Sequence, residues 1–445
     1  MMIDRRQYVY RQIEERDVRF IRLWFTDLLG GLKNVAITPS DIDEAFDEGM
    51  GFNGASVEGL AAVEKSDMLI HPDPETFQVL PWRPKDNAVA RMFCDIRRSD
   101  GTPAKADSRR LLREMLDKAS DMGFNLNVGT ALEFFYFKND RSPEPIDRGG
   151  YFDISPVDAA ADLRRETVLT LEQMGIPVEY SYHECSPGQQ EIDLRYTDAL
   201  EAADAIMTAR LVIREVAASL GVHASFMPKP IENQAGSAMH VHMSLFDEAG
   251  ENAFFDGDDP DGYNLSQVAK MFIAGLMKYA PEYMLVTNQW VNSYKRLVPG
   301  YDAPMYVSWG QSNRSSLVRV PRYKPGKATS SRVEVRTVDC AANPYLAIAV
   351  MLGAGLKGIE DGLELPAPVT ANVFDLTQAQ REEMGLEPLP TNLAWAIDRF
   401  ASSQLMREIL GEDVFSYLIK SKRAEWESYR SHVTSWEIDR YLAKL

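Results

Sequence analysis

Short stretches of the chain alternate polar and apolar residues, so that ionisable side chains stand two positions apart. Five such stretches occur, at 131–133, 191–195, 240–242, 318–320 and 332–336. Side chains alternate across a strand, so positions i and i+2 share one face. Carboxylates and imidazoles on such faces are metal ligands, and arginines beside them suit phosphate and carboxylate groups. The pattern therefore predicts strands that direct metal-binding and anion-binding groups into a common space.

Three glutamates are candidate ligands of one metal ion. Glu184 ends an extended run, and a turn at Pro187-Gly188 brings the chain back to Glu191. Together with Glu133 they would form the oxygen-rich site that Mg²⁺ or Mn²⁺ prefers. Any one of these glutamates, taken alone, is better explained as a surface acid. It is the convergence of three that favours a metal site.

His240 and His242 stand two positions apart within the stretch 236–244. A histidine pair with this spacing can ligate zinc, or one histidine can bind a metal while the other contacts a nucleotide. Buried histidines that bond backbone carbonyls are the structural alternative. The sequence contains no HExxH or CxxC pattern, which weakens the zinc interpretation.

Arginines concentrate in one region of a chain that is acidic overall; they are Arg296, Arg314, Arg319, Arg332 and Arg336. Guanidinium groups bind phosphates and carboxylates and neutralise the charge that develops in phosphoryl transfer. Two or three of them could lie on solvated faces, but the pair flanking Glu334 on one strand is harder to explain in that way. Acids, histidines and arginines together predict a divalent metal, a polyphosphate and a carboxylate substrate. These are the requirements for ATP-dependent activation of a carboxylate to an acyl phosphate.

The elements that must position these residues fall into two groups. The first hundred residues form a small mixed unit, with a helix at 4–15 and strands at 20–25, 35–37, 77–80 and 88–93. The turn-forming segment 100–103 predicts domains of 1–103 and 104–445. Beyond it, strands alternate with helices that begin near Ser108 and at Asp198, a helix at 265–279 that stops before Pro281, and helices at 345–359, 402–418 and 420–430.

Composition narrows the classes of function. The chain has 445 residues, 45% apolar and 26% charged, with a formal charge of −18. These values are typical of a soluble two-domain protein and argue against nucleic acid or an anionic membrane as partner. Three unpaired cysteines and an N-terminus without an apolar signal core predict the cytoplasm. The most apolar run, about 12 residues at 345–356, is shorter than the roughly 20 that a membrane span requires.

Longer motifs make the chain resemble a known family. The segments 52–56, 236–244, 292–301, 313–315, 332–336 and 342–345 resemble those of the bacterial type I glutamine synthetases, and the similarity runs essentially end to end. The resemblance implies an α+β fold, with an N-terminal β-grasp domain and a catalytic domain whose curved antiparallel sheet is flanked by helices. It also implies a homo-oligomer, a dodecamer of two hexameric rings, with active sites shared between neighbours.

The resemblance also implies a role for each motif residue. One metal would be held by Glu133, Glu184 and Glu191, and the second by His240 and Glu334. L-Glutamate would be bound by Arg296, Arg336, Glu133 and the backbone at Gly236. The phosphates of ATP would be bound by Arg314 and Arg319, and the rest of the nucleotide by Glu179, Tyr196, His242, Ser244 and Arg332. Catalysis would rely on Asp302, Arg314, Glu184 and Asn53.

Three positions depart from the family pattern. Ala131 stands in place of a carboxylate at the second metal. Asn53 replaces a loop aspartate that helps to bind and deprotonate ammonium, and Asp302 replaces a flap glutamate one methylene longer. A synthetase that uses ammonium needs negative charge to concentrate this cation and a base to deprotonate it. Because positions 53 and 302 now leave more room and less negative potential, we expect an organic amine as acceptor and a γ-glutamyl amide as product.

Other functions stay open on the sequence. Glu184 and Asp302 could still serve ammonium, which gives ordinary glutamine synthesis. A catalytically weak paralogue that serves assembly or regulation would explain the loss at Ala131, although the other ligands and the arginines are retained. A zinc hydrolase lacks a zinc-specific ligand set. At the second metal we expect a water or another carboxylate to fill the gap that Ala131 leaves.

Overall fold

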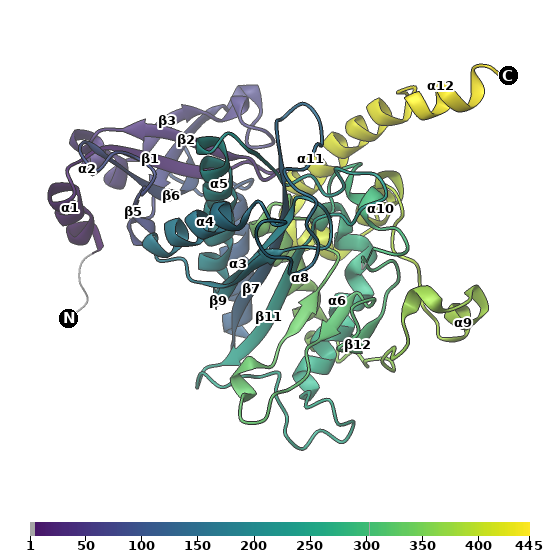
Figure 1. Ribbon diagram of the computed structural model, residues 1–445. Coiled ribbons are helices and arrows are strands. Elements are labelled where there is room, and N and C mark those ends of the chain that lie inside the picture. The colour runs from purple at the N-terminus through teal and green to yellow at the C-terminus, as the bar shows by residue number, and fades with distance from the viewer. Residues whose placement is uncertain (1–4, 302) are drawn as a thin grey trace.

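The computed structural model describes residues 5–301 and 303–445, and the predicted catalytic residue Asp302 lies outside them. Two sheets organise the chain (Figure 1), the first close to the N-terminus and the second in the larger body. The predicted boundary at 100–103 lies in the connection between them. The division into domains at residue 103 stays a prediction.

The N-terminal sheet has the strand order β2-β1-β6-β4-β3, and β5 also pairs with β6. β1 and β6 run parallel, and the other pairs are antiparallel. Helices α1 (Arg5–Glu15) and α2 (Ile42–Asp47) flank this sheet. The strands are β1 (Val18–Thr26), β2 (Leu32–Ile37), β3 (Met50–Asn53), β4 (Asp67–Pro72), β5 (Gln78–Val79) and β6 (Ala88–Arg98). The expected small mixed unit is therefore present.

The second sheet has the strand order β12-β13-β14-β11-β7-β9-β8, with β10 paired to the end of β7. Apart from the β12–β13 pair, its neighbours are antiparallel. The strands are β7 (Phe124–Phe137), β8 (Val178–His183), β9 (Gln189–Asp198), β10 (His223–Ser225), β11 (Met239–Asp247), β12 (Trp309–Gln311), β13 (Val318–Val320) and β14 (Val333–Val335). The long central strand β7 is almost wholly buried, which explains its apolar composition.

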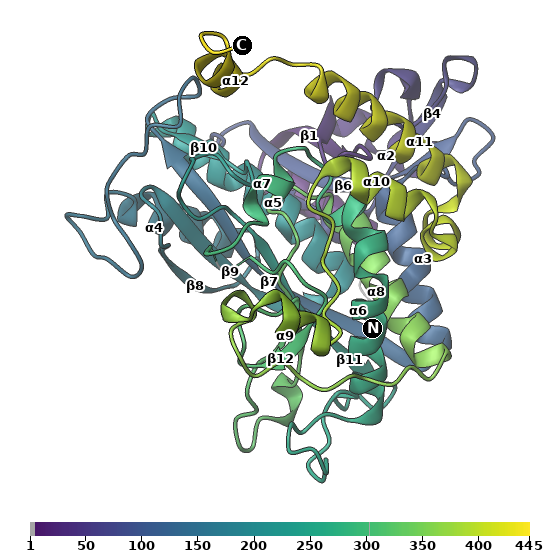
Figure 2. The same ribbon diagram turned by 90° about the vertical axis from the view of Figure 1, so that its right-hand side faces the viewer.

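Four long helices pack beside this sheet (Figure 2); they are α3 (Ser108–Asp121), α5 (Ala199–Ser219), α6 (Gln267–Thr287) and α8 (Pro344–Glu360). The apolar run at 345–356 lies in α8 and is buried throughout, as expected. Helices α6 and α8 touch backbone to backbone. A Cβ on Gly358 would lie 2.2 Å from the carbonyl oxygen of Met271, so only glycine permits this approach.

Two helices differ from the prediction. α6 continues through Pro281, where the sequence predicts a stop. The proline removes one backbone hydrogen bond, but burial of α6 against α8 outweighs that loss. At the C-terminus, α11 (Gln404–Arg430) consists of two helical segments that meet at a kink at Gly411, and the second segment passes the break expected at 419. Its irregular residue is Gly411, whose φ of 74° is a conformation that glycine adopts without strain.

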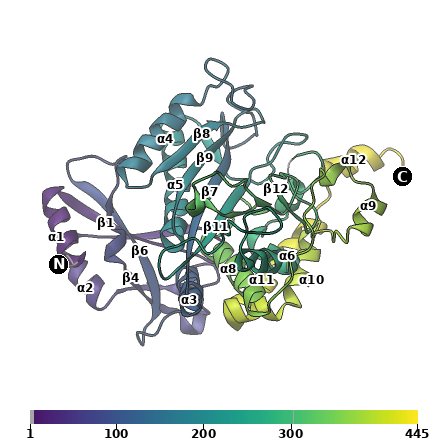
Figure 3. The same cartoon turned by 90° about the horizontal axis from the view of Figure 1, so that it is seen from below.

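The remaining helices are not expected from the sequence; they are α4 (Ala161–Gln173), α7 (Ser293–Arg296), α9 (Gln378–Glu383), α10 (Leu393–Ala401) and α12 (Ser435–Tyr441). Figure 3 shows α9 and α12 on the side of the molecule away from the N-terminal sheet. Within residues 5–301 and 303–445, no helix combines the length and apolar character needed to cross a membrane.

Candidate active site

The five polar–apolar stretches all lie in the second sheet, on adjoining strands. β7 pairs with β11 so that Ala131 faces His240. β7 also pairs with β9 so that Glu133 faces Glu191. Directly opposed residues of an antiparallel pair point to the same face of a sheet. Strand register therefore brings acids and a histidine together that are far apart in sequence.

The next strands add arginines to the same face. Glu334 on β14 faces His242 on β11 on one side and Arg319 on β13 on the other. Arg336 follows β14 directly and also donates to Glu334. The sequence predicts that the metal-binding and anion-binding side chains lie close together, and the structure places them on one face of the sheet.

A cavity of about 750 Å³ opens on this face. The predicted site residues that line it are Glu133, Glu184, Glu191, Gly236, His240, His242, Arg296, Arg314, Arg319, Arg332, Glu334 and Arg336. Ala131 lines it as well. The structure brings these predicted residues together, while their individual roles stay predictions.

Glu334 is held ionised by its neighbours. One carboxylate oxygen accepts a hydrogen bond from Arg336, and the other accepts one from Arg319. Burial alone would raise the pKa of Glu334, but the nearby charges of Arg336 and Arg319 outweigh it and lower the pKa well below its usual range. Nδ1 of His240 lies 3.8 Å from Oε1 of Glu334.

Glu133 has the opposite electrostatic surroundings. Its Oε2 accepts hydrogen bonds from the backbone N–H of Ala238 at 3.0 Å and from Nε2 of Gln189 at 3.2 Å. Its Oε1 lies 3.6 Å from Nε2 of His240. Burial and the negative charge of Glu184 raise the pKa of Glu133 to about 8. At this carboxyl, burial and the neighbouring acid therefore outweigh the positive charges of Arg296 and Arg336.

The acids on β9 show the same crowding. Burial and the charge of Glu133 raise the pKa of Glu191 well above its usual value, although the hydroxyl of Tyr182 donates to Oε1 of Glu191 at 2.5 Å. Burial also raises the pKa of Asp193 to about 6. Asp193 is a cavity residue that the sequence analysis did not single out. Its place two positions after Glu191 is the signal that would have found it.

The two histidines of the cavity, His240 and His242, are neutral, so a ring nitrogen of each can bind a metal ion. Burial and the charge of Arg336 hold the pKa of His240 well below its usual value. Burial also lowers the pKa of His242 to about 4, and Nε of Arg332 donates to its Nδ1 at 3.3 Å. Neutral imidazoles among buried carboxylates that repel one another are a suitable donor set for a divalent cation. The residues present therefore fit such an ion.

The arginines differ in how deeply they lie. Arg296 is buried and donates to the carbonyl oxygens of Thr337 and Arg336, at 2.8 and 2.9 Å. Arg336 is also buried, and its Nε donates to the carbonyl oxygen of Arg314 at 3.0 Å. The Arg314 side chain is exposed at the cavity rim. The buried Arg296 and Arg336 suit an anionic substrate inside the cavity, and the exposed Arg314 suits phosphate groups at its opening.

Within residues 5–301 and 303–445, four predicted site residues do not line this cavity: Asn53, Glu179, Tyr196 and Ser244. Asn53 belongs to the N-terminal sheet and is exposed, and its Oδ1 accepts from the backbone N–H of Ala55 at 3.0 Å. Glu179 is exposed on β8. The hydroxyl of Ser244 donates to the carbonyl oxygen of Ser331 at 2.9 Å.

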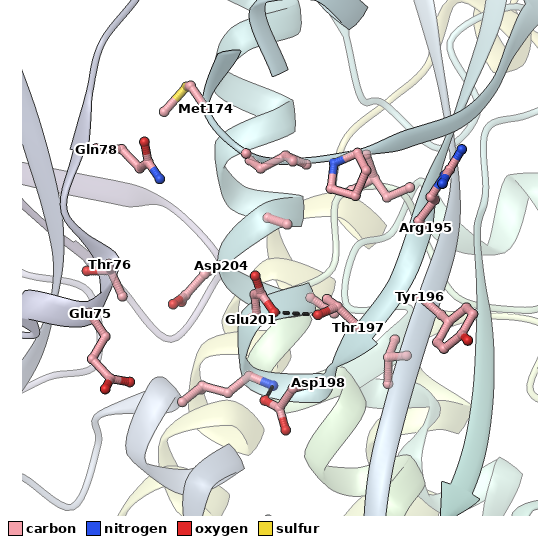
Figure 4. A pocket seen from close by; sticks show the side chains of 18 of the residues that line it. Glu75, Thr76, Gln78, Met174, Arg195, Tyr196, Thr197, Asp198, Glu201 and Asp204 are labelled. Atoms are coloured by element: carbon pink, nitrogen blue, oxygen red, sulfur yellow. Dashed lines mark hydrogen bonds between the residues drawn. The ribbon is translucent and has the colours of Figure 1, made fainter. Parts of the chain in front are cut away.

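Tyr196 lines a different cavity, of about 620 Å³, between the N-terminal sheet and the start of α5 (Figure 4). The β7–β9 register shifts beyond Leu194, where Arg195 and Tyr196 lie opposite the single residue Gly129. Such a bulge changes the alternation of side chains. Strict alternation along the sequence therefore does not predict where Tyr196 lies.

Two family models match the chain. The model for the β-grasp domain of glutamine synthetase matches residues 17–99, and the model for its catalytic domain matches residues 105–441. The chain belongs to the glutamine synthetase family. The match confirms the predicted fold class of a β-grasp domain followed by a catalytic α+β domain, and it makes the chain a ligase that forms C–N bonds.

Relatives cover nearly the whole chain. It is 56% identical to a glutamine synthetase of Mycolicibacterium smegmatis, over 98% of this chain and 99% of that one. It is 53% identical to a glutamine synthetase of Mycobacterium tuberculosis H37Rv with the same coverage. Among solved structures, a GmaS/ADP complex is 30% identical with a TM-score of 0.89, covering 97% of this chain and 99% of that one. Plasmodium falciparum glutamine synthetase, at 23% identity and a TM-score of 0.88 over 99% of each chain, shares the fold.

Proposed function

We propose that this glutamine synthetase family ligase uses ATP to join the γ-carboxyl group of L-glutamate to an organic amine, through a γ-glutamyl phosphate. The observation that carries the proposal is a cavity with the acids and arginines of a ligase, combined with a neutral Asn53 in the loop that serves the acceptor in the family. ADP in the related GmaS structure supports a nucleotide as co-substrate.

Arginines of the cavity account for binding of glutamate and phosphate. The buried Arg296 and Arg336 are fixed by backbone carbonyls, so they can receive the substrate carboxylate without reordering. Arg314 and Arg319 would bind the transferred phosphate and stabilise its charge. Glu179, Tyr196, His242, Ser244 and Arg332 remain the residues proposed to contact the rest of the nucleotide.

Two Mg²⁺ or Mn²⁺ ions fit the crowded acids. Glu133, Glu184 and Glu191 would hold one, and His240 and Glu334 the other. When bound, such ions neutralise the phosphate oxygens and polarise the group that is transferred. The residues of the chain orient the γ-carboxylate of glutamate to attack the γ-phosphate of ATP, which forms γ-glutamyl phosphate and releases ADP. The amine then loses a proton and displaces phosphate from this intermediate.

The rim of the cavity suits an amine that carries carbon. Tyr151, which lines the cavity, stacks on Phe152 with ring centroids 4.0 Å apart, and Phe152 meets Tyr182 edge to face. The charge of Glu184 contributes to raising the pKa of the Tyr151 hydroxyl, after burial, so the ring and the acid are close. Aromatic faces beside a carboxylate attract alkylammonium groups, and Glu184 can accept the proton of the amine.

Asn53 cannot act in the cavity of its own chain, because it is exposed in the N-terminal sheet and does not line that cavity. We therefore propose a homo-oligomer, a dodecamer of two hexameric rings, in which the partner's Asn53 completes each site. In this assembly the acceptor would meet the neutral side chain of Asn53 instead of a second acid.

Steady-state ATP turnover with glutamate tests the proposal. Ammonium is compared with a panel of an alkylamine, ethanolamine and a polyamine, and we expect the highest kcat/KM with one of the amines. Asn53→Asp should lower the KM for ammonium, because aspartate can keep the hydrogen bond to Ala55 and adds charge. Asn53→Ala is the matched control, since it removes that bond and adds no charge.

Ordinary glutamine synthesis is the second candidate, favoured by the names of the relatives at 56% and 53% identity. The same panel decides between the two functions. Best turnover with ammonium at low concentration would overturn the amine proposal, and it would leave the assignment to the ligase family intact.

A further inference from the structure

The place of Ala131 in the sheet shows which residue could compensate for its missing carboxylate. Ala131 on β7 lies between His240 on β11 and Asp193 on β9, because both are its directly opposed partners. Opposed residues of antiparallel strands have Cβ atoms roughly 4.5–5.5 Å apart and share a face. All three residues line the same cavity. A carboxylate thus stands on the neighbouring strand, one strand spacing from the position where the chain has only a methyl group.

One oxygen of the Asp193 carboxyl, Oδ1, has no hydrogen-bond donor within the described part of the chain. This atom is nevertheless shielded from solvent. A buried acceptor with no partner is costly, and native proteins normally satisfy such groups with protein, water or an ion. The carboxyl of Asp193 also shares a side-chain hydrogen bond with Glu191, so Oδ1 is the atom of this group that is left for a further partner.

We propose that Asp193 supplies the carboxylate that Ala131 lacks, as a ligand of the metal ion shared with His240 and Glu334. This inference rests on the proposed function, since it adds a ligand to the second metal site of that function. The small side chain of Ala131 leaves the space between the two neighbouring strands open for the Asp193 carboxylate. A glutamate at 131 would occupy the same space, so the two carboxylates are alternatives.

If Asp193 replaces a carboxylate at position 131, the carboxylate can be moved from one position to the other without loss of the metal site. Asp193→Asn keeps the shape of the side chain and removes its charge. Ala131→Glu places a carboxylate on the adjacent strand. If the two are alternatives, the double variant Ala131→Glu/Asp193→Asn recovers the metal affinity that the single variant Asp193→Asn loses. A residue that only orders its neighbours would not be replaced from another strand.

Binding of Mn²⁺ to the full-length protein, followed by electron paramagnetic resonance and calorimetry without substrates, tests the inference. We expect two classes of site in the native protein. Asp193→Asn should weaken one class roughly 10–100-fold, since even outer-shell partners of metal ligands have effects of this size. The other class should be unchanged, and the double variant should recover the lost affinity. Glu201→Gln, which removes an exposed acid of the other cavity, is the charge-matched control.

The outcomes separate this inference from the proposed function. If the native protein binds two Mn²⁺ ions and Asp193→Asn retains both affinities, the role of Asp193 is wrong and the proposed function stands. If Asp193→Asn weakens binding but Ala131→Glu does not recover it, the exchange between the two strands is wrong. Glu133→Gln should abolish one Mn²⁺ site of the native protein. If it abolishes none, the metal ions assigned in the proposed function are wrong. Thermal unfolding of each variant reports whether its fold is intact.

Discussion

The cavity and the junction between the two sheets both bury several charged side chains, but they differ in how those charges are balanced. At the junction, Arg109 of α3 donates to Asp204, Asp95 and Asp73, with distances between 2.9 and 3.1 Å. Asp204 also accepts from the hydroxyl of Tyr345 at 2.6 Å. Each nitrogen of the buried Arg109 guanidinium thus has a carboxylate partner from the chain itself.

The pKa values of the charged groups differ in the same way between the junction and the cavity. Burial opposes the charge of Arg109, yet Asp204 and its neighbours hold the pKa of Arg109 well above its usual value. In the cavity, burial and mutual repulsion raise the pKa of Glu133 and of Glu191 instead. A cluster that is complete without a ligand stabilises the fold, whereas a cluster of like charges prepares a place for a cation. Asp204 lies in the second cavity (Figure 4), whose lining therefore includes part of the structural cluster.

The largest effect on stability should follow from Arg109→Met. Removing this side chain leaves the buried Asp204 and the partly buried Asp73 and Asp95 without their shared partner. We expect the free energy of unfolding to fall by about 3–5 kcal/mol, as when one partner of a buried pair is lost. Urea denaturation measures it. Arg113→Met is the control, because Arg113 is half-exposed and its bond to Asp95 should contribute about 1 kcal/mol or less. Equal losses for the two variants would contradict a special role for the buried cluster.

Glu133→Gln should lower activity while leaving stability intact. The amide still accepts from Ala238 but carries no charge, so we expect ATP turnover to fall roughly 10²–10³-fold, the effect of removing one preorganised electrostatic group. The free energy of unfolding should stay the same or rise, because a repulsive buried acid is removed. Turnover and urea denaturation of one preparation provide both values. A variant that is active but unstable would place Glu133 with the structural cluster.

The free energy of unfolding should depend on pH because Glu133 in the cavity has a raised pKa. Glu133 has a pKa of about 8 in the folded protein and near 4.5 when unfolded, so the folded state binds the proton more tightly. Its contribution to stability is therefore complete below pH 4.5 and is lost as the pH rises to about 8. Bound Mn²⁺ replaces the proton, so we expect the metal to reduce this slope and to release protons on binding. Thermal unfolding across this range, with and without Mn²⁺, measures the effect; identical slopes would count against it.

The smallest effect should come from Tyr182→Phe. The Tyr182 hydroxyl donates to the ionised form of Glu191, so its removal should raise the pKa of Glu191 further and favour its protonated state. The hydrogen bond contributes roughly 0.5–1.5 kcal/mol, which corresponds to a few-fold loss in Mn²⁺ affinity near pH 7. Calorimetric titration can resolve a change of this size. An increase in affinity would show that the tyrosine restrains Glu191 away from the ion.

Much of the site could be predicted from the sequence because alternation is a local property. All five stretches lie in one sheet, and the buried apolar helix is where the pattern places it. The continuation of α6 through Pro281 could not be predicted in this way, because packing against distant helices decides it. The position of Tyr196 could not be predicted from alternation either, because a bulge decides it, and a bulge depends on pairing between strands. The place of Asp193 two positions after Glu191 is visible in the sequence, whereas its place beside Ala131 is set by the register of β7 and β9.

A competition experiment decides whether the acceptor is an organic amine or ammonium. The protein, ATP, Mg²⁺ and glutamate are incubated with ammonium and the panel of amines at equal concentrations, and the products are identified by mass spectrometry. The proposed function predicts that a γ-glutamyl amide of one organic amine is the main product. Glutamine as the main product under these conditions would contradict it.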